Sequence, residues 1–408
     1  MRRVGPEEDG FAFCTGRGET SRFLADPRRR AGFDARWGRD GQIRILVKIF
    51  PGGGGQPLPL PEGGHGARAG IRLFGACPVV IGLQLASLNP VTDSTTTNFD
   101  RQNQAKADFT GIYHAPTPHA YLREMARLGY QIGEQAKPYL AAATDFLGER
   151  NECDEPVRML DLGSSYGVAS ALVKYGCSLE ELLAFFDNRA PEASLACIQS
   201  TKRWLAAVPP RRDIGIVGFD SSAPAIAFGE ATGLLDEGIA TDLEQPGAVP
   251  TPAERECVRR SNLLVSTGAV GYVTERTFSP VLADLGKDHP GAFGQAAVLT
   301  VLRMFDISPI AGCFADAGLQ FEPLSGVLLP QRAFASDQEK NEILEILSER
   351  GIDTEGAESD GILFAEVWIA GAPSVFEDFR SCMARVATQA DVEPLLATHC
   401  EVALAGCA

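Results

Sequence analysis

A glycine-rich turn within residues 157–168, Val-Arg-Met-Leu-Asp-Leu-Gly-Ser-Ser-Tyr-Gly-Val, constrains the fold of this chain more than any other feature. An apolar run ends near Asp161, the chain turns through Gly163 and Gly167, and a helix-like run begins at Val168. Glycine adopts backbone angles that a side chain forbids, and it lets the backbone approach a ligand closely. A strand, a tight turn and a helix N-terminus in this order predict a cradle for a nucleotide-like ligand.

Other interpretations of the same residues stay open. The dinucleotide fingerprint Gly-x-Gly-x-x-Gly is not met by Gly-Ser-Ser-Tyr-Gly. The segment does match the nucleophile elbow of α/β-hydrolases, Gly-x-Ser-x-Gly, with Ser165 as nucleophile. An elbow normally follows several strands, which are not evident before residue 157, and the only later histidines are His289 and His399. A structural turn that binds no ligand is the remaining alternative.

Length, charge and cysteine usage limit the class of protein. A chain of 408 residues can bury the core of one large domain or two. The net charge of −16 argues against non-specific nucleic-acid binding, which requires a basic surface. The ten cysteines form no Cys-x-x-Cys pair and no Cys/His cluster, so we expect reduced thiols in a cytoplasmic protein and no metal site. No apolar run reaches the ~18 residues of a membrane span, and no secretory signal is evident.

The first 90 residues differ in composition from the rest. They contain 13 basic against 8 acidic residues and 17 of the 43 glycines, without sustained helical or strand periodicity. We expect residues 1–90 to be poorly ordered. The sequence Val-Thr-Asp-Ser-Thr-Thr-Thr from Val91 resembles a bacterial N-terminus, so we predict that translation begins near Val91, which N-terminal sequencing of native protein tests. A basic tail for an acidic partner is the alternative.

Residues 91–150 are predicted to form a helical segment ahead of the glycine turn. Apolar and aromatic residues recur at roughly helical spacing over residues 121–132, and a second helix is expected over residues 136–147. The aromatic rings of Tyr121 and Tyr130 are expected to pack against the sheet.

After the glycine turn, apolar runs alternate with helix-like runs, as a mostly parallel sheet requires. One short apolar run, residues 214–219, ends at Asp220, and Ser221 or Ser222 is expected to N-cap the next helix. Residues 178–212 predict a helical pair inserted before this strand.

These segments resemble class I S-adenosylmethionine (SAM) methyltransferases. Their motif I, Asp/Glu-x-Gly-x-Gly-x-Gly, is matched by Asp161, Gly163, Ser165 and Gly167, with Ser165 in place of the middle glycine. Asp220 matches the motif II acid, which in the family accepts hydrogen bonds from both ribose hydroxyls of the cofactor.

The spacing of this acid departs from the usual pattern. Asp220 follows Gly163 by 57 residues instead of the usual ~20. Asp187 is nearer, but it lies in a helix-like run, so Asp220 is preferred.

Two further segments extend the resemblance. Residues 238–244 resemble the third strand of the family, which places Asp242 and Leu243 near the adenine. Residues 261–273 resemble motif IV, which faces the methyl acceptor. Thr267, Tyr272 and Glu275 are therefore predicted to line the reaction centre.

The resemblance implies an α/β fold, a doubly wound, mostly parallel seven-stranded sheet of Rossmann-like type with a helical cap. The SAM-binding domain is expected over residues 151–375, with residues 376–408 as a C-terminal tail. Its last elements are expected to be strands at residues 297–305, 319–329 and 362–370, with helices at residues 310–317 and 337–350. Similarity to uncharacterised bacterial methyltransferase-like proteins is clearest at residues 266–272 and 330–332.

The implied function is SAM-dependent methyl transfer to a small-molecule acceptor, with neither nucleic acid nor membrane as partner; a homodimer is left open. Glu275 or His114 is the candidate base, and Tyr113, Thr267 and Tyr272 are candidate acceptor-binding residues. For Tyr113 and His114, packing in the core is an equal alternative. A SAM-binding protein without catalysis and a serine hydrolase using Ser165 are the alternative functions.

Overall fold

We describe a computed structural model of the chain. It covers the backbone of four strands before residue 50 and then residues 110–150, 155–187, 194–289 and 295–390. The chain divides into two units, Met1–Ser94 and Thr95–Ala408, which are described separately.

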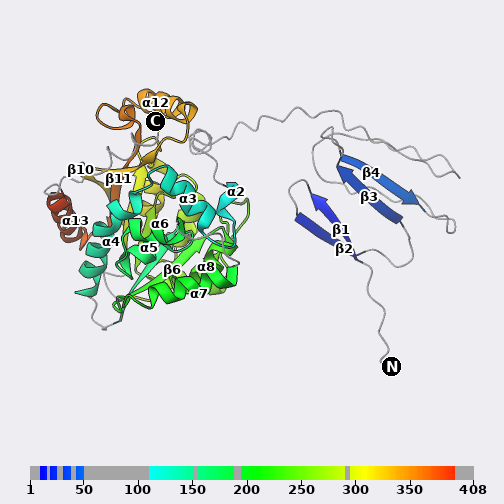
Figure 1. Cartoon of the computed structure of the whole chain (residues 1–408), viewed down its shortest axis with the longest axis horizontal. Helices are drawn as coiled ribbons and strands as arrows, with labels where there is room; N and C mark the ends of the chain where they lie inside the picture. Colours follow the sequence, from blue (N-terminus) through cyan, green and yellow to red (C-terminus); the bar gives the residue numbers. More distant parts are fainter. Residues whose placement is uncertain are drawn as a thin grey trace. The chain divides into compact units, whose positions relative to one another are not determined.

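The first unit contains two β-hairpins (Figure 1). Strand β1 (Gly10–Thr15) pairs antiparallel with β2 (Glu19–Leu24), and β3 (Ala31–Trp37) pairs antiparallel with β4 (Ile43–Ile49). That residues 1–90 are poorly ordered stays a prediction. That the native protein lacks residues 1–90 stays a prediction.

The second unit is built on a seven-stranded sheet with the order β10-β11-β9-β8-β5-β6-β7. Its strands are β5 (Val157–Leu162), β6 (Ile214–Asp220), β7 (Glu237–Ala240), β8 (Leu263–Thr267), β9 (Ala296–Leu302), β10 (Gln320–Ala333) and β11 (Ile362–Gly371). Only β11 runs antiparallel to both of its neighbours. Every residue of β9 is buried, as expected for a central strand covered on both faces. This strand order is that of the class I methyltransferases and confirms the predicted fold.

Helices alternate with these strands along the chain and flank the sheet. They are α2 (Thr110–Tyr113), α3 (His119–Arg127), α4 (Ile132–Gly148), α5 (Val168–Val173), α6 (Leu179–Asp187), α7 (Ser194–Leu205), α8 (Ala223–Thr232), α9 (Pro252–Arg259), α10 (Glu275–Leu282), α11 (Ser308–Asp316) and α12 (Asp337–Glu349). The inserted pair α6 and α7 is confirmed. Helix α7 lies beside α8 at one end of the unit, whereas α12 lies at the other (Figure 1).

The C-terminal segment corrects one prediction. Residues 376–390 form a helix, α13 (Phe376–Ala390), instead of a tail. Phe376, Phe379 and Met383 recur at helical spacing and are fully buried. The helix packs on α4, where the rings of Phe146 and Phe379 lie 5.1 Å apart. The core of the second unit therefore extends at least to residue 383.

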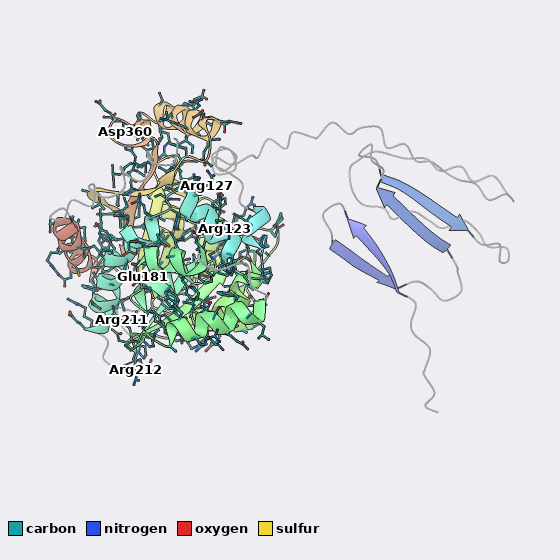
Figure 2. The ribbon with its side chains drawn as sticks, in the orientation of Figure 1. Arg123, Arg127, Glu181, Arg211, Arg212 and Asp360 are labelled. Carbon is teal, nitrogen blue, oxygen red and sulfur yellow. The ribbon has the colours of Figure 1, made fainter. Side chains whose placement is uncertain are left out.

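Many charged side chains lie at the surface of this unit. Arg123, Arg212 and Asp360, which Figure 2 labels, are exposed. Within the described ranges, no helix combines the length and apolar character needed to cross a bilayer.

Candidate functional site

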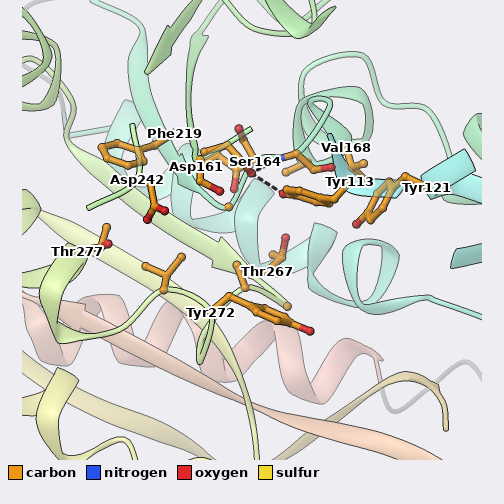
Figure 3. Close-up of a pocket in the computed structure, with 18 of the residues that line it drawn as sticks. Tyr113, Tyr121, Asp161, Ser164, Val168, Phe219, Asp242, Thr267, Tyr272 and Thr277 are labelled. Atoms are coloured by element: carbon orange, nitrogen blue, oxygen red, sulfur yellow. Dashed lines mark hydrogen bonds between the residues drawn. The ribbon is translucent and has the colours of Figure 1, made fainter. Parts of the chain in front are cut away.

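A cavity of about 280 Å³ opens where the central strands β5, β6 and β8 end (Figure 3). Strand β5 pairs with β6 on one side and β8 on the other, and such a switch point leaves a crevice at the carboxyl ends of the strands. Most of the predicted site residues line this cavity: Tyr113, His114, Asp161, Gly163, Ser165, Asp220, Asp242, Leu243, Thr267 and Tyr272. Gly167 and Glu275 are not among its lining residues.

The glycine turn forms the floor of the cavity. Gly163 has φ +77°, and a Cβ there would lie 2.3 Å from the Cβ of Ala269. Ser165 adopts φ 52°, a left-handed conformation that is unusual for a residue with a side chain. Gly167, at φ +87°, is the N-cap of α5, and a Cβ there would lie 2.8 Å from Leu234 Cβ. Both glycines therefore allow close packing, Gly163 against Ala269 and Gly167 against Leu234, and of the two only Gly163 lines the cavity.

Asp161 is a buried carboxyl group on the cavity wall. Its side chain lies at the end of β5 and is 2% exposed, and its Oδ1 atom accepts no hydrogen bond. Burial, followed by the negative charge of Asp220, raises the pKa of Asp161 from 3.8 to about 7. The group can therefore change protonation near neutral pH, and a cation in the cavity would stabilise its ionised form.

Asp220 is brought beside the glycine turn although 57 residues separate it from Gly163. Its Oδ2 accepts hydrogen bonds from the backbone N–H of Ser165 (2.9 Å) and from the Tyr113 hydroxyl (2.5 Å). Its Oδ1 accepts the backbone N–H of Ser222 (2.8 Å). The insertion leaves this geometry intact because β5 and β6 are adjacent parallel strands.

The flanking residues also follow the predicted pattern. Ser222 is the N-cap of α8, since its hydroxyl accepts the Ala225 N–H. Asp187, the nearer acid, lies at the end of α6 and forms a surface ion pair with Arg123 at 3.7 Å.

Tyrosine side chains form another wall. The carbonyl oxygen of Tyr113 accepts hydrogen bonds from the Tyr166 hydroxyl (3.2 Å) and from Ser222 Oγ (3.1 Å), which hold the segment before α3 over the cavity. Tyr130 packs against the hydrophobic core that contains the sheet, as expected, and Tyr121 packs against a second buried cluster. Both residues also line the cavity. The pKa values of Tyr113 and Tyr130 are raised, mainly by burial. Their hydroxyl groups therefore stay protonated and can act as hydrogen-bond donors.

The loop after β7 carries the predicted Asp242 and Leu243 to the cavity, but beyond the end of the strand. Asp242 accepts hydrogen bonds from the Glu244 N–H (3.0 Å) and from Gln245 Nε2 (2.8 Å), and Leu243 is buried. Glu244 also lines the cavity and was not predicted. The acidic run Asp-Leu-Glu was the only sequence signal for it.

Glu244 joins this loop to α10. Its carboxylate accepts hydrogen bonds from the Thr274 N–H (2.9 Å), the Thr274 hydroxyl (2.6 Å) and the Thr277 hydroxyl (2.6 Å). Glu275, the predicted base, is the first residue of α10, directly after the N-cap Thr274. It is not among the residues that line the cavity. His114 remains at the cavity, where it is exposed.

The sequence analysis assigned no role to several other residues that line the cavity. Ser164, Gln331 and Arg332 all line the cavity and are buried. The last two belong to the segment 330–332, which was noted only as a point of similarity. Their placement depends on pairing between β10 and β11, which the sequence alone does not specify.

Comparisons with known proteins find similarity at the level of structure. No protein-family model matches the sequence, and no curated protein matches it significantly. A TehB-like SAM-dependent methyltransferase from Corynebacterium glutamicum is 14% identical, with a TM-score of 0.26, covering 57% of this chain and 86% of that chain.

Two other solved structures contain S-adenosylhomocysteine (SAH). Magnesium protoporphyrin IX methyltransferase from Synechocystis is 10% identical, with a TM-score of 0.28, covering 68% of this chain and 94% of that one. The N-methyltransferase NodS from Bradyrhizobium japonicum is 10% identical, with a TM-score of 0.27, covering 68% and 98%. The strand order of this chain, independently of these similarities, defines its second unit as a class I methyltransferase fold.

Proposed function

We propose that this protein binds SAM and transfers its methyl group to a small-molecule acceptor. The observation that carries the proposal is the cavity at the switch point of the sheet. Gly163, which packs closely against Ala269, and the buried carboxyl group of Asp161 both line this cavity. Asp161 Oδ1 accepts no hydrogen bond from the protein, so it is available to a hydrogen-bond donor or a positive charge of a ligand.

The charge of the cavity fits a cationic cofactor. Four acidic side chains line it, whereas Arg332 is its only Lys or Arg among the described residues. Arg332 forms a buried ion pair with Glu339, with Nη2 2.7 Å from Oε1, so it does not neutralise the other acids. Asp220 would hold the ribose hydroxyls, Asp242 and Leu243 the adenine, and Asp161 the positively charged end of SAM.

Bound SAM supplies a methyl group on a positively charged sulfur, which activates that carbon towards a nucleophile in line with the C–S bond. The contribution of the chain is to position the acceptor and limit access of water. Thr267 and Tyr272 line the acceptor side, and the tyrosine wall covers the cavity. His114 is the better candidate for removing an acceptor proton, because Glu275 lies outside the lining.

Isothermal titration calorimetry with SAM on the full chain tests the cofactor site. Asp220→Asn should weaken binding at least about tenfold, because the carboxylate accepts hydrogen bonds that an amide cannot all replace. Asp316→Asn, an exposed acid at the end of α11, is the matched control and should bind like wild type. Absence of SAM binding by folded wild-type protein would reject the proposal.

Turnover separates catalysis from SAM binding alone. Transfer of label from [methyl-³H]SAM to a small molecule supports the enzyme, and tight binding without transfer to any acceptor supports a regulatory protein. The hydrolase interpretation gains no support, since Ser165 Oγ makes no hydrogen bond to a histidine within the described residues.

A further inference from the structure

A bulge in β10 directs Gln331 to the cavity. Pro330 pairs with Phe364 and Arg332 pairs with Leu363, so Gln331 is an extra residue without a partner on β11. A bulge of this kind changes the direction in which a side chain points. Gln331 lines the cavity although it lies on β10, at the edge of the sheet. Strands β11, β9 and β8 separate β10 from β5, which leads into the glycine turn.

The backbone around Gln331 is held on both sides. Its carbonyl oxygen accepts the Gln131 N–H at 2.7 Å, and the Ala333 N–H donates to the Leu128 carbonyl at 2.8 Å. Arg332 is anchored by its ion pair with Glu339. Gln331 is therefore positioned before any ligand binds, which reduces the entropy lost on binding.

The carboxamide of Gln331 has unused hydrogen-bonding capacity. The side chain is 4% exposed, and its Oε1 atom accepts no hydrogen bond. A Cβ placed on Gly268 would lie 3.6 Å from Gln331 Nε2 and 3.3 Å from the Tyr130 hydroxyl, so both polar groups adjoin the loop after β8. A buried amide oxygen at a cavity wall is an acceptor that an N–H or O–H donor of a ligand can satisfy.

The charge around this part of the cavity disfavours an anion. Arg332 is already paired with Glu339, and no other Lys or Arg lines the cavity within the described residues. A carboxylate or phosphate on the acceptor would meet the acidic groups of the cavity without a compensating lysine or arginine of the protein. A neutral or positively charged donor group avoids this repulsion.

We propose that Gln331 is a specificity-determining residue that accepts a hydrogen bond from an N–H or O–H group of a neutral or cationic methyl acceptor. This inference rests on the proposed methyl transfer and adds the chemical class of the acceptor. Tyr130, beside Gly268, supplies an aromatic surface and a hydroxyl at the same end.

The test uses the full chain, [methyl-³H]SAM and a metabolite extract of the native host. Ion exchange separates the extract into anionic, cationic and neutral fractions, and each is assayed with wild type, Gln331→Leu and Gln338→Leu. Gln338 lies on α12 with an exposed side-chain hydrogen bond to Glu342, so it controls for the same substitution outside the cavity. Calorimetry with SAM is run on all three proteins.

We expect label in the neutral or cationic fraction, with initial rates about tenfold lower for Gln331→Leu at subsaturating acceptor. A dilution series should assign the loss mainly to KM, and SAM affinity and Gln338→Leu should match wild type. Label from the anionic fraction, or equal rates for Gln331→Leu and wild type, would overturn the inference. Normal SAM binding without label in any fraction would also reject it, whereas absence of SAM binding would reject the proposed function itself.

Discussion

Replacing Asp161 with Asn should make the protein more stable above neutral pH, although it removes a predicted cofactor contact. The carboxyl is buried, Oδ1 has no hydrogen bond, and its pKa is raised from 3.8 to about 7. As pH rises through this interval, Asp161 ionises in the unfolded chain before it ionises in the native state. The wild-type native state therefore loses stability between these two values, and Asn, which cannot ionise, avoids that loss.

The shift sets an upper limit on the effect. Because each pKa unit corresponds to about 1.4 kcal/mol, ionised Asp161 destabilises the native state by at most about 4 kcal/mol. From pH 5 to pH 8, the advantage of Asp161→Asn in free energy of unfolding should grow by at most about 3 kcal/mol and then level off.

Urea unfolding of wild type and variant at several pH values, followed by tryptophan fluorescence, measures this difference. In an Asp220→Asn background the pH-dependent part should shrink, because the neighbouring charge that raises the Asp161 pKa is gone. Asp316→Asn is the exposed control and should show no comparable dependence. A difference between Asp161→Asn and wild type that stays constant from pH 5 to pH 8, or reverses sign, would refute the reasoning.

Three other perturbations follow from single contacts. Tyr113→Phe frees an oxygen of Asp220 for the ribose, so calorimetry should show SAM binding tightened by about two- to tenfold, and weaker binding would contradict competition at that oxygen. Gly163→Ala should destabilise the protein by about 2 kcal/mol more than Gly351→Ala in urea unfolding, since both have positive φ but only Gly163 faces a clash, and equal losses would contradict this. Arg332→Met leaves Glu339 buried without its cation and should lower the unfolding free energy by about 3–5 kcal/mol; Arg332→Met with Glu339→Leu should recover part of that loss, and no recovery would argue against an unpaired charge as the cause.

Most of the predicted site residues line the cavity, although their roles stay predictions. Asp161, Gly163 and Asp220 were read from local patterns, in which an apolar strand ends in an acid or a glycine turn. Parallel pairing then carries such strand ends to the same edge of the sheet. The 57-residue spacing did not disturb this result, because an insertion between strands leaves their pairing unchanged.

The position of other residues relative to the cavity depends on contacts that local patterns do not report. Tyr130 lies in the turn between α3 and α4 and lines the cavity. Glu275 is the first residue of α10 and lies outside the cavity lining. The helix α13 was missed as well, although Phe376, Phe379 and Met383 carry helical spacing, because the segment lies beyond the recognised strand pattern.

By itself, the sequence determined the chain order of the seven strands in the large sheet, the glycine turn and the acids at the ends of β5 and β6. These features arise from the periodicity and backbone preferences of neighbouring residues. Only the tertiary structure decided that Gln331 faces the same cavity as Asp161 and that Asp220 bonds to Tyr113. The reason is physical: the direction of a side chain on a bulge or beside a turn is set by residues that lie far away in the sequence.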